Sequence, residues 1–127
     1  MANDTQPRKL TGMAHFIAAS GYSAGGLARA WKEAAFRQEI GAGVVLIVAY
    51  AALGVSVPTM AAAAVLFLAL IGFEALNTAI EEIVDRISPE ISTTAKHAKD
   101  LGSFAVLCLI SANVIFLCSS VYVTVMR

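Results

Sequence analysis

Charged residues are scarce in this chain, and the common motifs for binding nucleotide phosphates are missing. Only 14% of its 127 residues are charged, against about 25% in soluble domains. The sequence contains no GxxxxGK(S/T) phosphate loop and no glycine-rich loop, HRD or DFG motif. Cys108 and Cys118 lie in an apolar run without a second sulfur or histidine at ligand spacing, so we expect them to pack. These absences argue against an ordinary soluble domain, a P-loop enzyme and a protein kinase.

The chain contains long apolar segments without charged residues. Hydrophobic residues make up 58% of the chain, the mean hydropathy is +0.75, and no charged residue occurs between Ile40 and Phe73. A helix needs about 20 mostly apolar residues to cross roughly 30 Å of hydrocarbon, and Pro58 suits the first turn of a new helix. We therefore predict an all-α integral membrane protein, with transmembrane helices at about 40–57, 59–87 and 99–126. In the last of these, Ser111 and Asn113 are expected to form interhelical hydrogen bonds.

The N-terminal segment has the pattern of a helix that lies in the membrane interface. Between about 10 and 37, apolar residues such as Leu27 and Trp31 recur at helical spacing, with charged residues such as Lys32 on the other side. We expect this surface helix and the three transmembrane helices to form a single domain, residues 1–127.

The basic residues indicate which side of the membrane is cytoplasmic. Lysines and arginines near the ends of spans mark that side. Apart from Arg127, they all precede the first span or fall between the second and third: Arg8, Lys9, Arg29, Lys32, Arg37, Arg86, Lys96 and Lys99. The connection between the first two spans carries no charge. We therefore predict that the N-terminus and a loop over 86–100, containing Lys96 and His97, face the cytoplasm.

A stripe of acids lies where the second apolar run ends. Glu74, Asn77, Glu81 and Asp85 are spaced i, i+3, i+7 and i+11, which places them on one face of a helix turning about 100° per residue. A carboxylate inside the bilayer costs about 3 kcal/mol or more, so it indicates a functional site. The stripe favours a metal or proton site. Because three helices cannot shield a polar face from lipid on every side, we also expect an oligomer.

Four segments, in order over nearly the whole chain, carry a resemblance to a known family. They are Gly21-Tyr22-Ser23, Glu33-Ala-Ala-Phe-Arg37-Gln-Glu39, Glu74-Ala-Leu-Asn77-Thr-Ala-Ile-Glu81 with Val84-Asp85-Arg86, and Ala98-Lys99-Asp100-Leu-Gly102-Ser103. These resemble the signature segments of prokaryotic diacylglycerol kinase, a small membrane lipid kinase of Gram-negative bacteria. The resemblance implies a homotrimer in the bacterial inner (plasma) membrane, with active sites between subunits. It also implies ATP and Mg²⁺ from the cytoplasm, diacylglycerol as acceptor and phosphatidic acid as product.

The resemblance also implies roles for individual residues. Glu33 and Glu81 match the family's metal-binding glutamates and are expected to hold Mg²⁺. Glu74 lies about two turns deeper than Glu81, where a lipid hydroxyl can reach, so we expect it to be the general base, oriented by Asn77. Lys99 is expected to neutralise the transferred phosphate. Nucleotide contact or a supporting role is expected for Tyr22, Arg37, Glu39, Asp85 and Asp100.

The chain departs from the family pattern near its N-terminus. His15 stands where a basic residue is usual, and the stretch from Tyr22 to Glu33 is one residue shorter. Since His15 supplies charge only when protonated, Arg29 is a candidate to take over part of that nucleotide contact.

Two other functions compete with diacylglycerol phosphorylation. The related undecaprenol kinases share the scaffold and metal site, but the Glu33 to Glu39 segment favours diacylglycerol. A small proton-coupled transporter could also use an intramembrane glutamate, but it needs polar access from both sides, and the outer half of this chain offers none. We expect membrane lipids and further copies of the chain as partners, and no nucleic acid.

Overall fold

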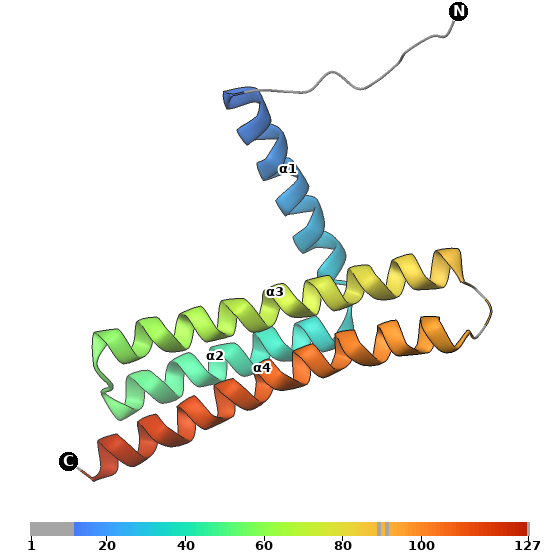
Figure 1. Cartoon of the computed structure of the whole chain (residues 1–127). Helices are drawn as coiled ribbons and strands as arrows, with labels where there is room; N and C mark the ends of the chain where they lie inside the picture. The colour runs from blue at the N-terminus through green and yellow to red at the C-terminus, as the bar shows by residue number, and fades with distance from the viewer. Residues whose placement is uncertain (1–11, 89, 91, 127) are drawn as a thin grey trace, which may run out of the picture.

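The computed structural model describes residues 12–88, 90 and 92–126, and every regular element within them is an α-helix. In chain order the helices are α1 (Met13–Ala30), α2 (Ala34–Leu53), α3 (Val57–Ile87) and α4 (Thr93–Val125). Helices α2, α3 and α4 run side by side, while α1 projects away from them (Figure 1). Arg8, Lys9 and Arg127, which entered the orientation argument, lie outside the described residues, as do residues 10 and 11 of the predicted surface helix.

Three of the helices, α2, α3 and α4, are each long and apolar enough to cross a membrane. The prediction of an all-α membrane fold with three spans is therefore confirmed. Many of their large apolar side chains are exposed in the single chain, including Val45, Leu68 and Ile115. A surface of this kind is stabilised by hydrocarbon rather than by water. At 31 and 33 residues, α3 and α4 are longer than the bilayer requires and carry the polar segments.

The turn between α2 and α3 shows how local sequence ends one helix and begins the next. Helix α2 ends at Leu53, before the predicted 57, because Gly54 takes the left-handed conformation at φ +62°. The hydroxyl of Ser56 then accepts a hydrogen bond from the Thr59 amide at 3.4 Å, and Pro58 lies in the first turn of α3.

The connection between α3 and α4 is shorter than the sequence suggested. The Ser92 hydroxyl accepts a hydrogen bond from the Ala95 amide at 3.1 Å, and α4 starts at Thr93. Lys96 and His97 are therefore helical, and their placement in a loop over 86–100 was wrong. The polarity of these two residues led to the prediction of a loop, although Ser92, a residue type that commonly caps helices, precedes them.

Close packing of α3 against its neighbours depends on two glycines. A methyl group on Gly43 of α2 would collide with the Phe67 ring, and one on Gly102 of α4 would collide with the Asn77 amide. The Asn113 amide nitrogen donates to the Leu66 carbonyl of α3 at 3.3 Å, which confirms its predicted interhelical bond. The same prediction was wrong for Ser111, whose hydroxyl donates within α4.

A break in the chain separates α1 from α2, and we call residues 31–33 the joint. One continuous helix had been expected to 37, but α1 ends at Ala30 and α2 begins at Ala34. The Arg37 guanidinium donates to the carbonyls of Trp31 and Lys32 at 2.9 and 2.8 Å, so carbonyls of the joint find a partner outside a regular helix. Phe36, which is 2% exposed, anchors the start of α2 against the bundle.

Candidate active site

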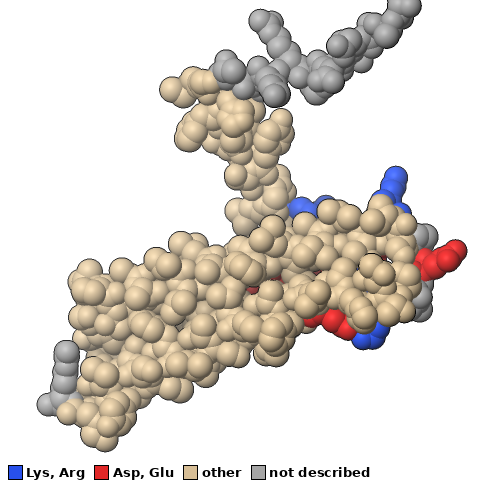
Figure 2. All heavy atoms as spheres, in the orientation of Figure 1, with Lys and Arg blue, Asp and Glu red and all other residues tan. Residues whose placement is uncertain are grey.

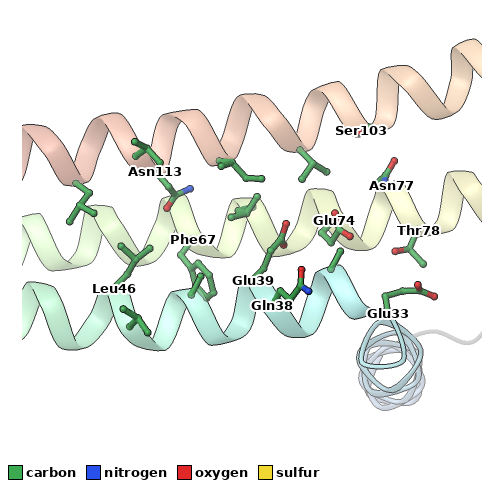
Figure 3. Close-up of a pocket in the computed structure, with 18 of the residues that line it drawn as sticks. Glu33, Gln38, Glu39, Leu46, Phe67, Glu74, Asn77, Thr78, Ser103 and Asn113 are labelled. Atoms are coloured by element: carbon green, nitrogen blue, oxygen red, sulfur yellow. The ribbon is translucent and has the colours of Figure 1, made fainter.

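A cavity of about 840 Å³ lies between α2, α3 and α4, and we call it the carboxylate cavity. Four acids from two stretches of the chain line it: Glu33, Glu39, Glu74 and Glu81. In Figure 3 the side chains of Glu39 and Glu74 point into the space between the helices, and Glu33 lies at the end next to α1. The volume is in the range of small-molecule sites, which is about 300–1,000 Å³.

Charge is concentrated at one end of the molecule. On the face shown in Figure 2, the Lys, Arg, Asp and Glu side chains lie over the end where α3 finishes and α4 starts, and the opposite end of the bundle shows none. Two of the acids of the carboxylate cavity, Glu74 and Glu81, come from the half of α3 that leads to this end. The cavity thus connects a charged surface to an apolar interior.

Glu74 is the most deeply placed acid of the predicted stripe. It lies in a membrane-spanning helix, is 6% exposed and lines the carboxylate cavity. No hydrogen bond links its carboxylate to another residue within the described part of the chain. Deeper in the cavity the lining is mostly apolar, with Leu70, Val106 and Ile110 among the residues and Asn113 as a polar exception. The arrangement offers an oxygen base at the boundary between polar and apolar walls.

Asn77 and Glu81 form the next polar layer towards the charged end. The Asn77 amide nitrogen donates to Glu81 Oε1 at 3.3 Å, and both residues line the cavity. The Asn77 amide oxygen is buried without a partner among the described residues, where Gly102 of α4 approaches it. A buried acceptor of this kind is costly, by about 1–3 kcal/mol, unless a bound group or water donates to it.

Glu33 and Glu39 enter the cavity from the joint and from α2. Glu33 is the residue before α2, and its side chain makes no capping bond to the helix. Instead it accepts a hydrogen bond from Arg29 Nη1 at 2.6 Å. That bond is the main reason that the pKa of the Arg29 guanidinium is raised above its usual value. Glu39 has one carboxylate oxygen, Oε2, buried without a partner among the described residues.

These oxygens fit a hard cation better than a soft one. Among the described residues, no three His, Cys, Asp or Glu side chains cluster closely enough to hold a metal on their own. Magnesium is usually held by one or two carboxylates, with water and substrate phosphates as its other ligands. Carboxylates on several sides of one cavity and an unpartnered buried oxygen on Glu39 fit that mode of binding.

Several residues predicted for the site do not line the cavity. Lys99 Nζ donates to Asp85 Oδ1 at 2.6 Å, which links α4 to α3 at the charged end. Asp100 accepts from Lys96 at 2.5 Å on the surface of α4. Tyr22 is 78% exposed on α1, and Arg37 holds the joint.

Sequence reasoning missed one partner at the edge of the site. No feature of the sequence singled out Glu82, but its carboxylate accepts a hydrogen bond from Arg29 Nε and so ties α1 to α3. It does not line the cavity. No sequence signal identified this pair, because its members are far apart in the chain and belong to different helices.

Comparison with known proteins gives a consistent result. The family model described as prokaryotic diacylglycerol kinase matches residues 21–121. A diacylglycerol kinase from Sinorhizobium is 54% identical over 108 residues, covering 85% of this chain and 79% of that protein. One from Escherichia coli K12 is 44% identical over 120 residues, covering 93% of each. One from Pseudomonas aeruginosa PAO1 is 47% identical over 97 residues, covering 75% of this chain and 78% of that protein.

Proposed function

The chain belongs to the prokaryotic diacylglycerol kinase family, and from this premise we propose that the carboxylate cavity is its active site. The protein is a membrane kinase that transfers the γ-phosphate of ATP to diacylglycerol and forms phosphatidic acid. Its relatives are named for diacylglycerol rather than for a polyprenol, and they are kinases rather than transporters. Neither alternative function has an observation in its favour.

The position of Glu74 carries the assignment of the site. An acid at membrane depth needs a function to offset its energetic cost, and this one faces a cavity whose inner walls are mostly apolar. Acyl chains can occupy the apolar part while the hydroxyl of diacylglycerol lies at the level of Glu74. The charged end of the cavity remains available to the phosphates of ATP.

In the proposed reaction, Glu74 is the general base. Its carboxylate takes the proton of the primary hydroxyl as the hydroxyl oxygen bonds to the γ-phosphorus of ATP. The bond from that phosphorus to the β–γ bridging oxygen breaks, and ADP leaves. Asn77, one turn away, positions the polar groups here, since it already donates to Glu81. Its amide oxygen is buried beside Gly102 of α4 and has no partner among the described residues.

The remaining acids suit the nucleotide end of the cavity. Glu33 and Glu81 would hold Mg²⁺ together with phosphate oxygens, and Glu39 lies on the same lining. When bound, the ion would neutralise charge on the β- and γ-phosphates. Lys99, which pairs with Asp85 in the structure, would add positive charge to the phosphates. Tyr22 and Asp100 remain proposed nucleotide contacts, and Arg37 a residue that supports the joint.

We further propose that the protein acts as a homotrimer in the bacterial inner membrane, with its N-terminus in the cytoplasm. Apolar side chains cover the exposed surfaces of α2, α3 and α4. A polar cavity open at its side would meet lipid in a single chain, and neighbouring subunits would close it. A cytoplasmic location of the charged end follows from its lysines and arginines.

Glu74→Gln tests the active-site assignment. The amide keeps the shape of the side chain but cannot act as a base. We expect turnover with diacylglycerol to fall about 100-fold or more, while the affinity for Mg²⁺–ATP changes less than threefold, roughly, as for a group that contacts no nucleotide. The measurement is a set of initial rates with labelled ATP in detergent micelles, with nucleotide titrations beside it. Glu90→Gln, an exposed acid outside the cavity, is the matched control. Near-normal turnover of Glu74→Gln would show that the base lies elsewhere.

A further inference from the structure

We propose that Arg29 is a positioning residue for Glu33 and that Glu82 of α3 holds Arg29 in place. The inference rests on the proposed role of Glu33 in holding Mg²⁺. It concerns two residues that lie outside the cavity lining and that the proposed reaction does not use.

One guanidinium joins the two acids. Arg29 Nη1 donates to Glu33 Oε1 at 2.6 Å, and Arg29 Nε donates to Glu82 Oε1. The planar fork of an arginine fixes the direction of both bonds, which a lysine ammonium would not do. Only one oxygen of Glu33 is engaged in this way, so its other oxygen remains available on the side of the cavity.

The carboxylate of Glu33 needs a partner outside α2, because Glu33 belongs to neither of the helices that flank it. It lies in the joint, where regular helical bonding is interrupted, and its side chain makes no capping bond to α2. The side chain is 40% exposed. Arg37 fixes the backbone on one side of this residue through the carbonyls of Trp31 and Lys32. The contact with Arg29 fixes its carboxylate.

Glu82 holds the Arg29 side chain against α3. It follows Glu81, the other proposed metal-holding acid, directly in the chain. A bridge from Glu82 through Arg29 to Glu33 therefore ties the joint to the turn of α3 that carries Glu81. The physical consequence is a constrained separation between the two acids. An exposed ion pair adds little stability by itself, so we assign the bridge to positioning rather than to folding.

The expected effect is on metal dependence. Hydrogen-bonding partners of metal ligands typically change metal affinity by about 10–100-fold when removed. We therefore expect Arg29→Ala to raise the free Mg²⁺ needed for half-maximal nucleotide binding by about 10-fold or more. Glu82→Ala should act in the same direction but less, because Arg29 keeps its bond to Glu33. The double variant should match Arg29→Ala alone, since Glu82 acts through Arg29.

The test is equilibrium dialysis of a labelled non-hydrolysable ATP analogue against the detergent-solubilised protein over a series of free Mg²⁺ concentrations. Arg29→Lys should recover part of the affinity, because an ammonium can reach Glu33 but cannot reproduce the fork. Lys32→Ala is the matched control: it removes a positive charge three residues away, and its side chain forms no ion pair within the described part of the chain. Each variant is first compared with the parent for oligomer size and thermal stability.

Three results would overturn the proposal. They are an unchanged or tighter Mg²⁺ dependence for Arg29→Ala, additive effects in the double variant, and an equal loss in Lys32→Ala. If Arg29→Ala fails to fold, Glu82→Ala carries the same test from the α3 side. Glu33→Gln separates this inference from the proposed function. If Glu33→Gln leaves the Mg²⁺ dependence unchanged, the metal assignment fails. If Glu33→Gln changes the Mg²⁺ dependence and Arg29→Ala does not, only the positioning role fails.

Discussion

Replacing Gly102 by alanine should disturb a close contact between α3 and α4. A methyl group at this position would collide with the side-chain oxygen of Asn77, and it would lie 3.8 Å from the Asn77 Cα. The collision can be relieved only if the Asn77 amide rotates or the helices separate. Rotation of the amide would weaken the 3.3 Å bond from Asn77 to Glu81, whereas separation of the helices would loosen the packing of α4 beside Asn77. The substitution therefore links a packing defect to the candidate site.

The size of the effect follows from two opposing terms. Overpacking a closely packed contact costs about 1–3 kcal/mol, whereas exchanging a helical glycine for alanine gains roughly 0.5–1 kcal/mol. Gly41→Ala in α2 should show only the gain from exchanging a helical glycine, because a methyl group there meets nothing within 4 Å. The difference in unfolding free energy between Gly102→Ala and Gly41→Ala should thus be about 1–3 kcal/mol, with Gly102→Ala the less stable.

The assay is reversible unfolding in mixed detergent and SDS micelles, followed by circular dichroism. Adding Asn77→Ala to Gly102→Ala removes the colliding amide, so the double variant should recover stability, with a coupling energy of about 0.5–3 kcal/mol. Equal stability of the two glycine variants, or no coupling with Asn77, would refute the packing described between α3 and α4.

Four further predictions concern the site and the assembly. Glu33→Gln and Glu81→Gln should each raise the Mg²⁺ requirement of nucleotide binding in a metal titration, because an amide is a weaker ligand for a hard cation; an unchanged requirement would remove that residue from the metal site. Lys99→Ala should lower turnover about 10²-fold, whereas Lys96→Ala, which breaks an exposed pair with Asp100, should leave initial rates within about twofold. Chemical cross-linking in micelles should saturate at three chains, and an active monomer or a uniform dimer would contradict the trimer. Asn113→Ala should cost about 0.6 kcal/mol in SDS unfolding, and Ser111→Ala less, because only the Asn113 bond joins two helices.

Local features of the sequence determined the membrane fold and the deepest part of the site. Hydropathy is a property of each segment, so three spans could be predicted without knowledge of their contacts. Helical periodicity placed Glu74, Asn77 and Glu81 on one face of α3, and these three do line one cavity. The likeness of several short segments to one family is also local information, and it identified the family that the comparisons found.

Other features depended on side-chain contacts that form only in the folded chain. The break at residues 31–33 interrupts a sequence with helical periodicity, and it is held by the Arg37 side chain and the burial of Phe36. The bridge from Arg29 to Glu82 joins residues of two helices. The close approach of Gly102 to Asn77 could not be predicted from the sequence, because the two residues meet only when α3 and α4 pack together.

The start of α4 lies between these two cases. Its capping residue, Ser92, was present in the sequence, but the polar turn around Lys96 resembled a loop more than the first turns of a membrane helix. Sequence alone thus determined which segments enter the bilayer and which acids share a face of α3. Tertiary structure decided how Glu33 and Glu39 reach that face, because the helix break depends on the burial of Phe36 and the ion bridge joins Arg29 to Glu82, which lies far away in the chain.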